Sequence, residues 1–163
     1  MEGRPVSESR VTLSQPMGVT EANVLGNVHG GVLMKICDEA GAMAAMKHGR
    51  RPVVTVTVDS MSFHSAVNMG DLLPVEAQVT WVGRSSLETR LIVTAENIMT
   101  GAITHTNTAY YVYVALDESG EPSAVPPLIC RTDEERTLFE EGAARQAYRL
   151  ERRRQERPIS ISP

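Results

Sequence analysis

The sequence has few of the residues that hold metal ions or cross-link small extracellular proteins. Its 163 residues include two cysteines, Cys37 and Cys130, which lie far apart and have no neighbouring ligands at metal spacing. The four histidines lie in different predicted elements, so we expect no metal site. Two free thiols are typical of a reducing compartment, and we expect a cytoplasmic protein.

Long apolar runs and an excess of positive charge are also absent. No stretch approaches the ~18 apolar residues of a membrane span, and residues 1–10 lack the basic start and apolar stretch of a secretory signal. The net charge of −4 argues against nucleic-acid binding, which depends on a basic surface. Neither a phosphate-binding glycine loop nor a nucleophilic serine elbow occurs. A small anionic ligand is still compatible with the scattered cations.

The composition that is present, 42% hydrophobic and 22% charged, is that of a globular protein, and the length fits one domain. Helical periodicity predicts a helix over 32–47, and alternating β-prone residues predict five strands, over 11–17, 53–63, 72–82, 86–96 and 102–116. On the second strand, alternation places Thr55, Thr57 and Asp59 on one face. We therefore expect an α+β fold with an antiparallel sheet and its last four strands in meander order. Pro16 indicates that the first strand either lies at an edge of the sheet or ends there.

The composition changes after the last predicted strand. A linker-like segment with Pro126 and Pro127 is followed by a polar helix, predicted over about 133–156. Thr132 and Glu135 have the spacing of a capping box at its start. We expect a main domain over 8–125 and a helical tail over 126–163, which either covers a neighbouring subunit or lies free.

The predicted central helix is apolar nearly all round, as is typical of a helix wrapped by a sheet. Asp38 is the exception, because its neighbours one turn away are Met34, Gly41 and Ala42. A buried carboxylate is costly unless something holds it. Asp38 is therefore either a structural acid, which caps a loop or pairs with a cation, or a functional one. The small residues near it leave room for a ligand along the helix.

Gly30 and Gly31 precede this helix. The N–H groups of a first helical turn have no partner within the helix, and glycine lets a substrate carbonyl approach them, as an oxyanion hole requires. The same pair is equally typical of a plain turn into a helix. Cys37, on the buried face, is expected to be a packing residue and not a nucleophile.

Four segments together resemble a known family: ANVLGNVHGG (22–31), DEAGA (38–42), VGRSS (82–86) and ENIMTG (96–101). They are similar to segments of the hotdog-fold acyl-CoA thioesterases, especially the bacterial broad-range hydrolases and the brain-type long-chain acyl-CoA hydrolase. The resemblance covers roughly residues 10–130. It implies a five-stranded antiparallel sheet wrapped around one long helix.

The resemblance also implies a shared active site. It places the family's catalytic carboxylate on Asp38 and its catalytic asparagine on Asn23. In the family, dimers join two sheets edge to edge, and each site combines the asparagine of one subunit with the aspartate of the other. Three such dimers form a hexamer, so the resemblance implies a homohexamer here.

The implied reaction is hydrolysis of an acyl-CoA to a free fatty acid and CoA, without a metal or a cofactor. The N–H of Gly31 or Gly30 would polarise the carbonyl, and Asp38 would activate water or attack directly. The CoA phosphates are expected at a rim of cations and turn amides: Arg84, Ser85, Ser86, Lys47, Arg50 and Arg51.

Two other functions stay open at the level of sequence. A hydratase or dehydratase of acyl thioesters would need a histidine paired with an acid across the dimer, and His29 is the histidine placed to serve. A sensor that binds acyl-CoA without turnover would need an attached DNA-binding module, which the charge-balanced tail does not resemble.

Overall fold

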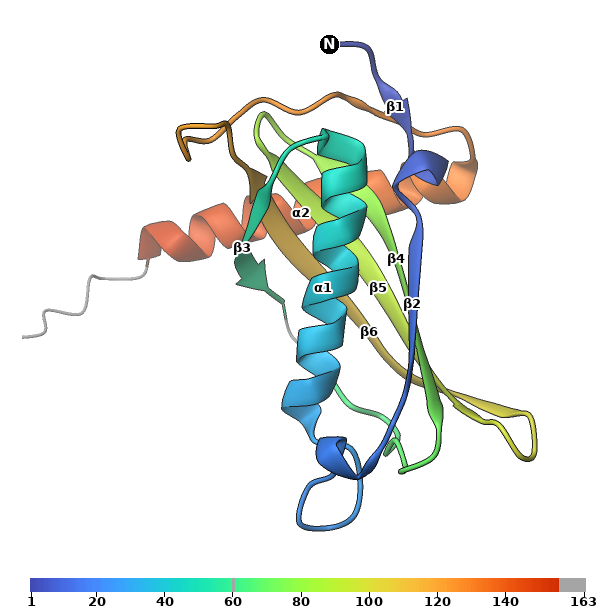
Figure 1. The fold of residues 1–163 in the computed structure, drawn as a ribbon. Helices are drawn as coiled ribbons and strands as arrows, with labels where there is room; N and C mark the ends of the chain where they lie inside the picture. The colour runs from blue at the N-terminus through green and yellow to red at the C-terminus, as the bar shows by residue number, and fades with distance from the viewer. Residues whose placement is uncertain (60, 156–163) are drawn as a thin grey trace, which may run out of the picture.

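Five antiparallel strands form one sheet that curves around a single long helix, which confirms the predicted architecture (Figure 1). The structure is a computed structural model and describes residues 1–59 and 61–155. Along the sheet the strands are β2 (Val11–Pro16), β4 (Leu72–Val82), β5 (Ser86–Asn97), β6 (Ala102–Ala115) and β3 (Val53–Val58), and the helix is α1 (Gly30–Gly49). No helix in the described residues is long and apolar enough to cross a membrane.

The core lies between α1 and the concave face of the sheet. Strand alternation turns every second residue of β4, β5 and β6 toward the helix, so that Tyr111 and Tyr113 face α1 while Tyr110 faces outward. The helix contributes small or branched residues to this layer: Leu33, Ile36, Cys37, Ala40, Ala44 and Ala45. The helix extends two residues beyond its predicted range at each end, and Arg50, with φ of 53°, closes it in the left-handed region.

The predicted meander order is wrong at one place. β3 pairs with β6 and not with β4, so β3 and β2 form the two edges of the sheet, the latter being one of the alternatives that Pro16 indicated. The segment between β3 and β4 is too long for a hairpin turn. It passes the start of α1, and its main chain forms hydrogen bonds with the main chains of Thr106, Val28 and Met17 in turn. It thereby carries the chain from the β3 edge to β4, which lies next to the opposite edge strand β2.

β3 is also shorter than predicted and irregular. It ends at Val58, and its register with β6 shifts between Thr55 and Thr57. Thr55 pairs with Tyr113, whereas Thr57 pairs with Val112, and these two partners point to opposite faces. The expectation that the two threonines share a face is therefore wrong, because a bulge interrupts the alternation.

The C-terminal helix α2 (Asp133–Gln155) begins at the predicted capping box, in which the N–H of Glu135 donates to Thr132 and the N–H of Thr132 donates to Glu135. Its predicted last residue, at position 156, lies outside the described residues. The tail does not lie free, because α2 packs across the convex face of its own sheet (Figure 1). The helix can approach β4 closely at Gly142, because a Cβ atom at this position would lie only 2.6 Å from Cβ of Trp81.

Two short strands were not predicted. β1 (Arg4–Pro5) pairs in parallel with β7 (Leu128–Ile129), and single 3₁₀ turns occur at Val6–Ser9 and Val19–Glu21. The β1–β7 pair brings the N-terminal segment to the C-terminal end of α1, where Arg4 donates to the carbonyl of His48.

Candidate active site

The carboxylate of Asp38 lies half-buried in the middle of α1, on the side of the helix that faces β3 and β6. Thr55 of β3 donates its hydroxyl proton to Oδ1 of Asp38, with 2.6 Å between the oxygens. The hydroxyl of Tyr113, on β6, lies 3.3 Å from the same Oδ1 and 3.1 Å from the main-chain oxygen of Asp38. Both side-chain donors therefore converge on one carboxylate oxygen.

The second oxygen of Asp38 is left for other partners. Within the described residues, no donor is assigned to Oδ2, and no lysine or arginine forms an ion pair with this carboxylate. The bonds of Asp38 come from hydroxyl groups, so it is neither a loop cap nor half of a salt bridge. A carboxylate fixed at one oxygen and open at the other is suited to activate water or to attack a carbonyl.

Cys37 precedes this carboxylate but belongs to the core. Its side chain is fully buried, and burial together with the negative charge of Asp38 raises the pKa of its thiol to about 12. A thiol in this state is a poor nucleophile. The prediction that Cys37 is a packing residue is confirmed.

The glycines at the start of α1 lie where the sequence places them, but one of their N–H groups is occupied. The N–H of Gly31 donates to Nδ1 of His29, the residue that caps the helix, over 2.9 Å. This bond requires the neutral imidazole with its proton on Nε2. Gly31 becomes available to a substrate oxygen only when His29 turns away, and Gly30 begins the helix next to it.

Asn23 lies in the loop between the Val19–Glu21 turn and the start of α1, whereas Arg50 and Arg51 follow the other end of the helix. Its Oδ1 accepts from the N–H of Leu25 at 2.8 Å and from that of Asn27 at 3.3 Å, which stabilises the loop. Within the described residues, the side-chain nitrogen of Asn23 has no assigned hydrogen bond. From Gly30 to Asp38 alone the helix rises ~12 Å. A single protomer therefore does not bring Asn23 to Asp38.

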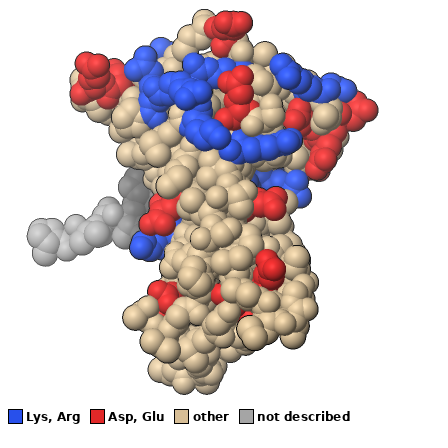
Figure 2. All heavy atoms as spheres, turned by 45° about the vertical axis from the view of Figure 1, so that its right-hand side comes forward, with Lys and Arg blue, Asp and Glu red and all other residues tan. Residues whose placement is uncertain are grey.

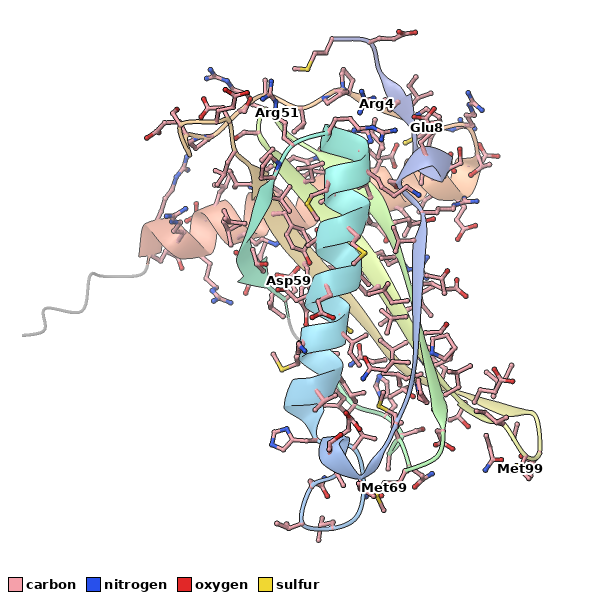
Figure 3. All side chains as sticks on the ribbon, in the orientation of Figure 1. Arg4, Glu8, Arg51, Asp59, Met69 and Met99 are labelled. Carbon is pink, nitrogen blue, oxygen red and sulfur yellow. The ribbon has the colours of Figure 1, made fainter. Side chains whose placement is uncertain are left out.

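The predicted phosphate rim is gathered at the opposite end of α1. The turn between β4 and β5 holds Arg84 and Ser85, whose main-chain oxygens accept from Val125 and Ala115. Arg51 lies near the same end (Figure 3), with Arg50 beside it and Ser86 at the start of β5. Lys47 also lies at this end of α1, but its ammonium donates to the main-chain oxygen of Arg10, just before β2.

A cavity of about 520 Å³ adjoins this rim. Arg4, Arg50 and Arg51 line it together with Glu2 and Glu8, while Asp38 is not among its lining residues. Figure 2 shows that lysine and arginine side chains gather at this end, whereas the other end of the molecule shows scattered acidic side chains and no such cluster of basic ones. By helix rise, Arg50 is ~18 Å from Asp38 along the axis.

Three residues of these two regions were missed by the sequence reasoning: Thr55, Tyr113 and Arg4. Each reaches its place through pairing between segments far apart in the chain, namely β3 with β6 and β1 with β7. The sequence does contain one signal for Tyr113, which is the glycine at position 41. A Cβ atom there would overlap with the hydroxyl oxygen of Tyr113. The room expected for a ligand beside Gly41 is thus occupied by that hydroxyl.

Comparison with known proteins identifies the family to which this chain belongs. Residues 25–102 match the family model described as the thioesterase superfamily. A relative from Bacillus subtilis (strain 168), an uncharacterized acyl-CoA thioester hydrolase, is 33% identical over 98% of this chain and 92% of its own. The chain belongs to the thioesterase superfamily.

More narrowly, the similar proteins are acyl-CoA thioester hydrolases. The cytosolic acyl coenzyme A thioester hydrolase of Mus musculus is 32% identical over 88% of this chain, which spans only 38% of the mouse protein. Among solved structures, an apo-hexameric acyl-CoA thioesterase has a TM-score of 0.89 at 38% identity, covering 93% of this chain and 97% of its own. The expected hotdog fold is thereby confirmed.

A second solved structure is informative about ligands. The acyl-CoA hydrolase of Staphylococcus aureus, in complex with butyryl coenzyme A, coenzyme A and coenzyme A disulfide, has a TM-score of 0.86 at 30% identity, with 93% of each chain covered. The same enzyme has been solved as variants in which an aspartate, a threonine or an asparagine is replaced by alanine.

Proposed function

We propose that this protein hydrolyses acyl-CoA thioesters to free fatty acids and CoA. The observation that supports this proposal best is the carboxylate of Asp38, which is anchored at Oδ1 by Thr55 and Tyr113 and open at Oδ2. The names of the relatives, and the butyryl coenzyme A bound to the S. aureus enzyme, agree with this substrate class.

The S. aureus variants support the choice of residues. The three positions replaced there are separated along the chain by the same numbers of residues as Asn23, Asp38 and Thr55. Two of these residues, Asp38 and Thr55, share a hydrogen bond in this structure. We assign the catalytic carboxylate to Asp38, its hydroxyl partner to Thr55 and the catalytic amide to Asn23.

Two routes are open to Asp38. As a general base it takes a proton from water, the water oxygen bonds to the acyl carbon, the C–S bond breaks, and the CoA thiolate takes up a proton. As a nucleophile, its free oxygen attacks the acyl carbon and expels the thiolate, and water then cleaves the anhydride. The amide of Asn23 would hold the water or the developing negative charge.

The carbonyl oxygen of the thioester needs a donor, and Gly30 and Gly31 at the positive end of α1 are our candidates. Because the N–H of Gly31 is engaged by His29, substrate entry must displace that contact.

We place the CoA phosphates at the basic end of α1. Arg84, Ser85 and Ser86 supply turn groups there, and Arg50 and Arg51 supply charge beside the cavity. Lys47 is the weakest of our candidates, because its ammonium is bound elsewhere. The pantetheine arm would then run along α1 toward Asp38.

A homo-oligomer would complete the site. β3 is an edge strand whose exposed side chains Val54, Val56 and Val58 are apolar, and Thr55 on it contacts Asp38. We propose that two copies pair along this edge, which brings Asn23 of one to Asp38 of the other. Hexamers among the solved relatives favour three such dimers.

The end of the protomer away from the arginine cluster would supply a surface for the larger assembly. Its exposed apolar side chains come from the Asn23 loop and the β5–β6 hairpin, among them Val24, Leu25, Ile98, Met99 and Ile103. Met69 and Met99 mark this end in Figure 3. Clustered apolar exposure of this kind is typical of an interface.

We further propose a cytoplasmic protein that works without a metal or a cofactor. The mouse relative is named as cytosolic. A thiolate is a good leaving group, so the reaction does not require a Lewis acid. Among the described residues, no three histidine, cysteine or acidic side chains lie together as a metal site would require. Dialysis against EDTA should accordingly leave the rate unchanged.

The test is release of free thiol from acyl-CoAs of several chain lengths. The protein should release CoA from at least one of them, and Asp38→Asn should lower kcat by at least ~100-fold, the usual scale for losing a general base. The matched control is Glu39→Gln, which removes the charge of the exposed neighbouring carboxylate and should leave kcat unchanged. Circular dichroism should show both variants folded.

The alternatives give different results in this assay. A hydratase would consume unsaturated acyl-CoA without releasing thiol, and a sensor would bind acyl-CoA without turnover. Full activity in folded Asp38→Asn would contradict the assignment of the carboxylate. If Asp38→Asn fails to fold, then the aspartate is structural and the proposed mechanism is wrong.

A further inference from the structure

Tyr113 contacts the same carboxylate as Thr55, but its side chain is fully buried and reaches Asp38 from β6, inside the core. Its hydroxyl has one proton to donate, and two acceptors of Asp38 are in reach, the main-chain oxygen at 3.1 Å and Oδ1 at 3.3 Å. The hydroxyl therefore joins the carboxylate to the helix backbone beneath it.

The helix is shaped to admit this hydroxyl. Gly41 follows Asp38 by three residues, on the same side of α1, and any Cβ atom there would overlap with the Tyr113 oxygen. Tyr113 of β6 therefore fits specifically against Gly41 of α1. Alanine is the better helix former, but its Cβ atom would not fit at this position.

Tyr113 remains a donor under all working conditions. Burial, the charge of Asp38 and their hydrogen bond together raise the pKa of its phenol above the ordinary value for tyrosine. The phenol consequently keeps its proton and can donate it to the carboxylate of Asp38.

A second tyrosine on the same strand provides a natural comparison. Tyr111 is also buried and faces α1 two residues earlier, but its hydroxyl lies 3.4 Å from the main-chain oxygen of Met34 and 3.8 Å from the sulfur of Met61. It touches the helix one turn before Asp38 and makes no contact with the carboxylate.

We infer that Tyr113 is a positioning residue for the proposed hydrolysis, which together with Thr55 fixes Oδ1 of Asp38 and turns Oδ2 toward the reacting carbonyl. Thr55 holds the carboxylate from the exposed edge of the sheet, and Tyr113 holds it from the core. With either donor missing, the carboxylate rotates about its side-chain bonds and spends less time in the reactive orientation. This inference rests on the proposed function.

The test compares Tyr113→Phe with Tyr111→Phe, since each variant removes one buried hydroxyl and keeps the ring. Loss of a hydrogen bond to a charged group should lower kcat of Tyr113→Phe by about tenfold while KM changes less than about twofold. Tyr111→Phe should keep kcat within about twofold of the wild type, because its hydroxyl does not touch the carboxylate. Thermal melting of both variants gives the structural cost of each hydroxyl.

The possible outcomes distinguish a failure of this inference from a failure of the proposed function on which it rests. If the wild type hydrolyses acyl-CoA and Asp38→Asn does not, but the two tyrosine variants have the same kcat, then Tyr113 is only a packing residue. A loss that appears in KM or in the melting temperature with kcat unchanged would overturn the inference equally. If the wild type releases no thiol, then it is the proposed function that fails.

Discussion

At the scale of single residues, Arg84 is the sharpest candidate for a group that binds CoA without taking part in the chemistry. Its side chain is exposed in the β4–β5 turn, and its main-chain oxygen holds Val125. Contacts between charges at a solvated rim act on binding and are screened by salt. Arg84→Ala should therefore raise KM for acyl-CoA by roughly threefold to tenfold, weaken its dependence on salt and leave kcat unchanged.

The control for Arg84 is a thioester that lacks the nucleotide, such as an acyl N-acetylcysteamine, because it has no phosphates to bind. Arg136→Ala serves as a matched variant, since Arg136 is an exposed arginine on α2 that pairs with Asp133 of its own helix. Equal damage to both substrates would show that Arg84 supports the turn, and Arg50 and Arg51 would then be the next phosphate candidates.

The residue scale also shows what a sequence can and cannot reveal about this site. Asp38 stands out because it is a lone carboxylate among apolar and small neighbours, a property that is visible along one helix. Thr55 and Tyr113 have no such local signature. Their roles depend on the pairing of Thr55 with Tyr113 between β3 and β6, which no local pattern specifies. The catalytic assignments of Asp38, Asn23, Gly30 and Gly31 all stay predictions.

At the scale of secondary-structure elements, α2 is joined to the sheet by a buried ionic cluster. Glu88 of β5 is completely buried and binds Arg145 of α2 at 2.8 Å as well as Arg149, which also pairs with Asp59 at 2.5 Å. Arg145 stacks over the ring of Tyr110, 3.7 Å from its centre. Since Asp59 follows β3 directly, the cluster links α2 to the end of the strand that holds Thr55.

Glu88→Ala should therefore cost stability, because it leaves two partly buried guanidinium groups without their main acceptor. We expect the free energy of unfolding to fall by about 3 kcal/mol, as when one partner of a buried ion pair is removed. Glu134→Ala breaks the exposed pair with Arg90 and should cost less than about 1 kcal/mol. Urea unfolding monitored by Trp81 fluorescence measures both. Equal values for the two variants would show that the buried cluster contributes nothing beyond a surface pair.

The elements also differ in how well their arrangement could be predicted. β4, β5 and β6 are joined by tight turns, so local turn chemistry determines that they are neighbours. The place of β3 depends instead on a long connection that passes the start of α1, and its bulge at Val56 depends on its pairing with β6. The position of α2 on the sheet was not predictable either, because nothing in the sequence around its partner Glu88 indicates an ionic contact.

At the scale of the whole molecule, our proposal assigns Asn23 and Asp38 of one protomer to two different active sites. Asp38 lies beside the β3 edge, and Asn23 lies beyond the start of the helix, in a loop whose apolar side chains are exposed. The described residues bring no second amide to Asp38. The proposed completion of the site by a second copy would bring an asparagine to Asp38 although the two residues lie far apart in one protomer.

The shared site gives a prediction that a self-contained site does not. Asn23→Ala and Asp38→Asn should each be nearly inactive alone. In a dimer with one chain of each kind, one site combines the intact Asn23 of the first partner with the intact Asp38 of the second, while the other site has lost both. Random mixing after subunit exchange should therefore restore about a quarter of the wild-type activity per chain.

Differently tagged chains allow the mixed dimers to be purified, so that failure to exchange is not mistaken for failure to complement. Purified mixed dimers should reach about half the wild-type kcat per dimer with KM unchanged, because one of the two sites is intact. The matched control mixes Asp38→Asn with a chain that carries both substitutions, in which no arrangement of subunits gives an intact site. Mixed dimers as inactive as that control would mean that Asn23 and Asp38 do not act together across a subunit boundary. The catalytic amide would then have to come from the same chain as Asp38, by a movement of the loop before α1.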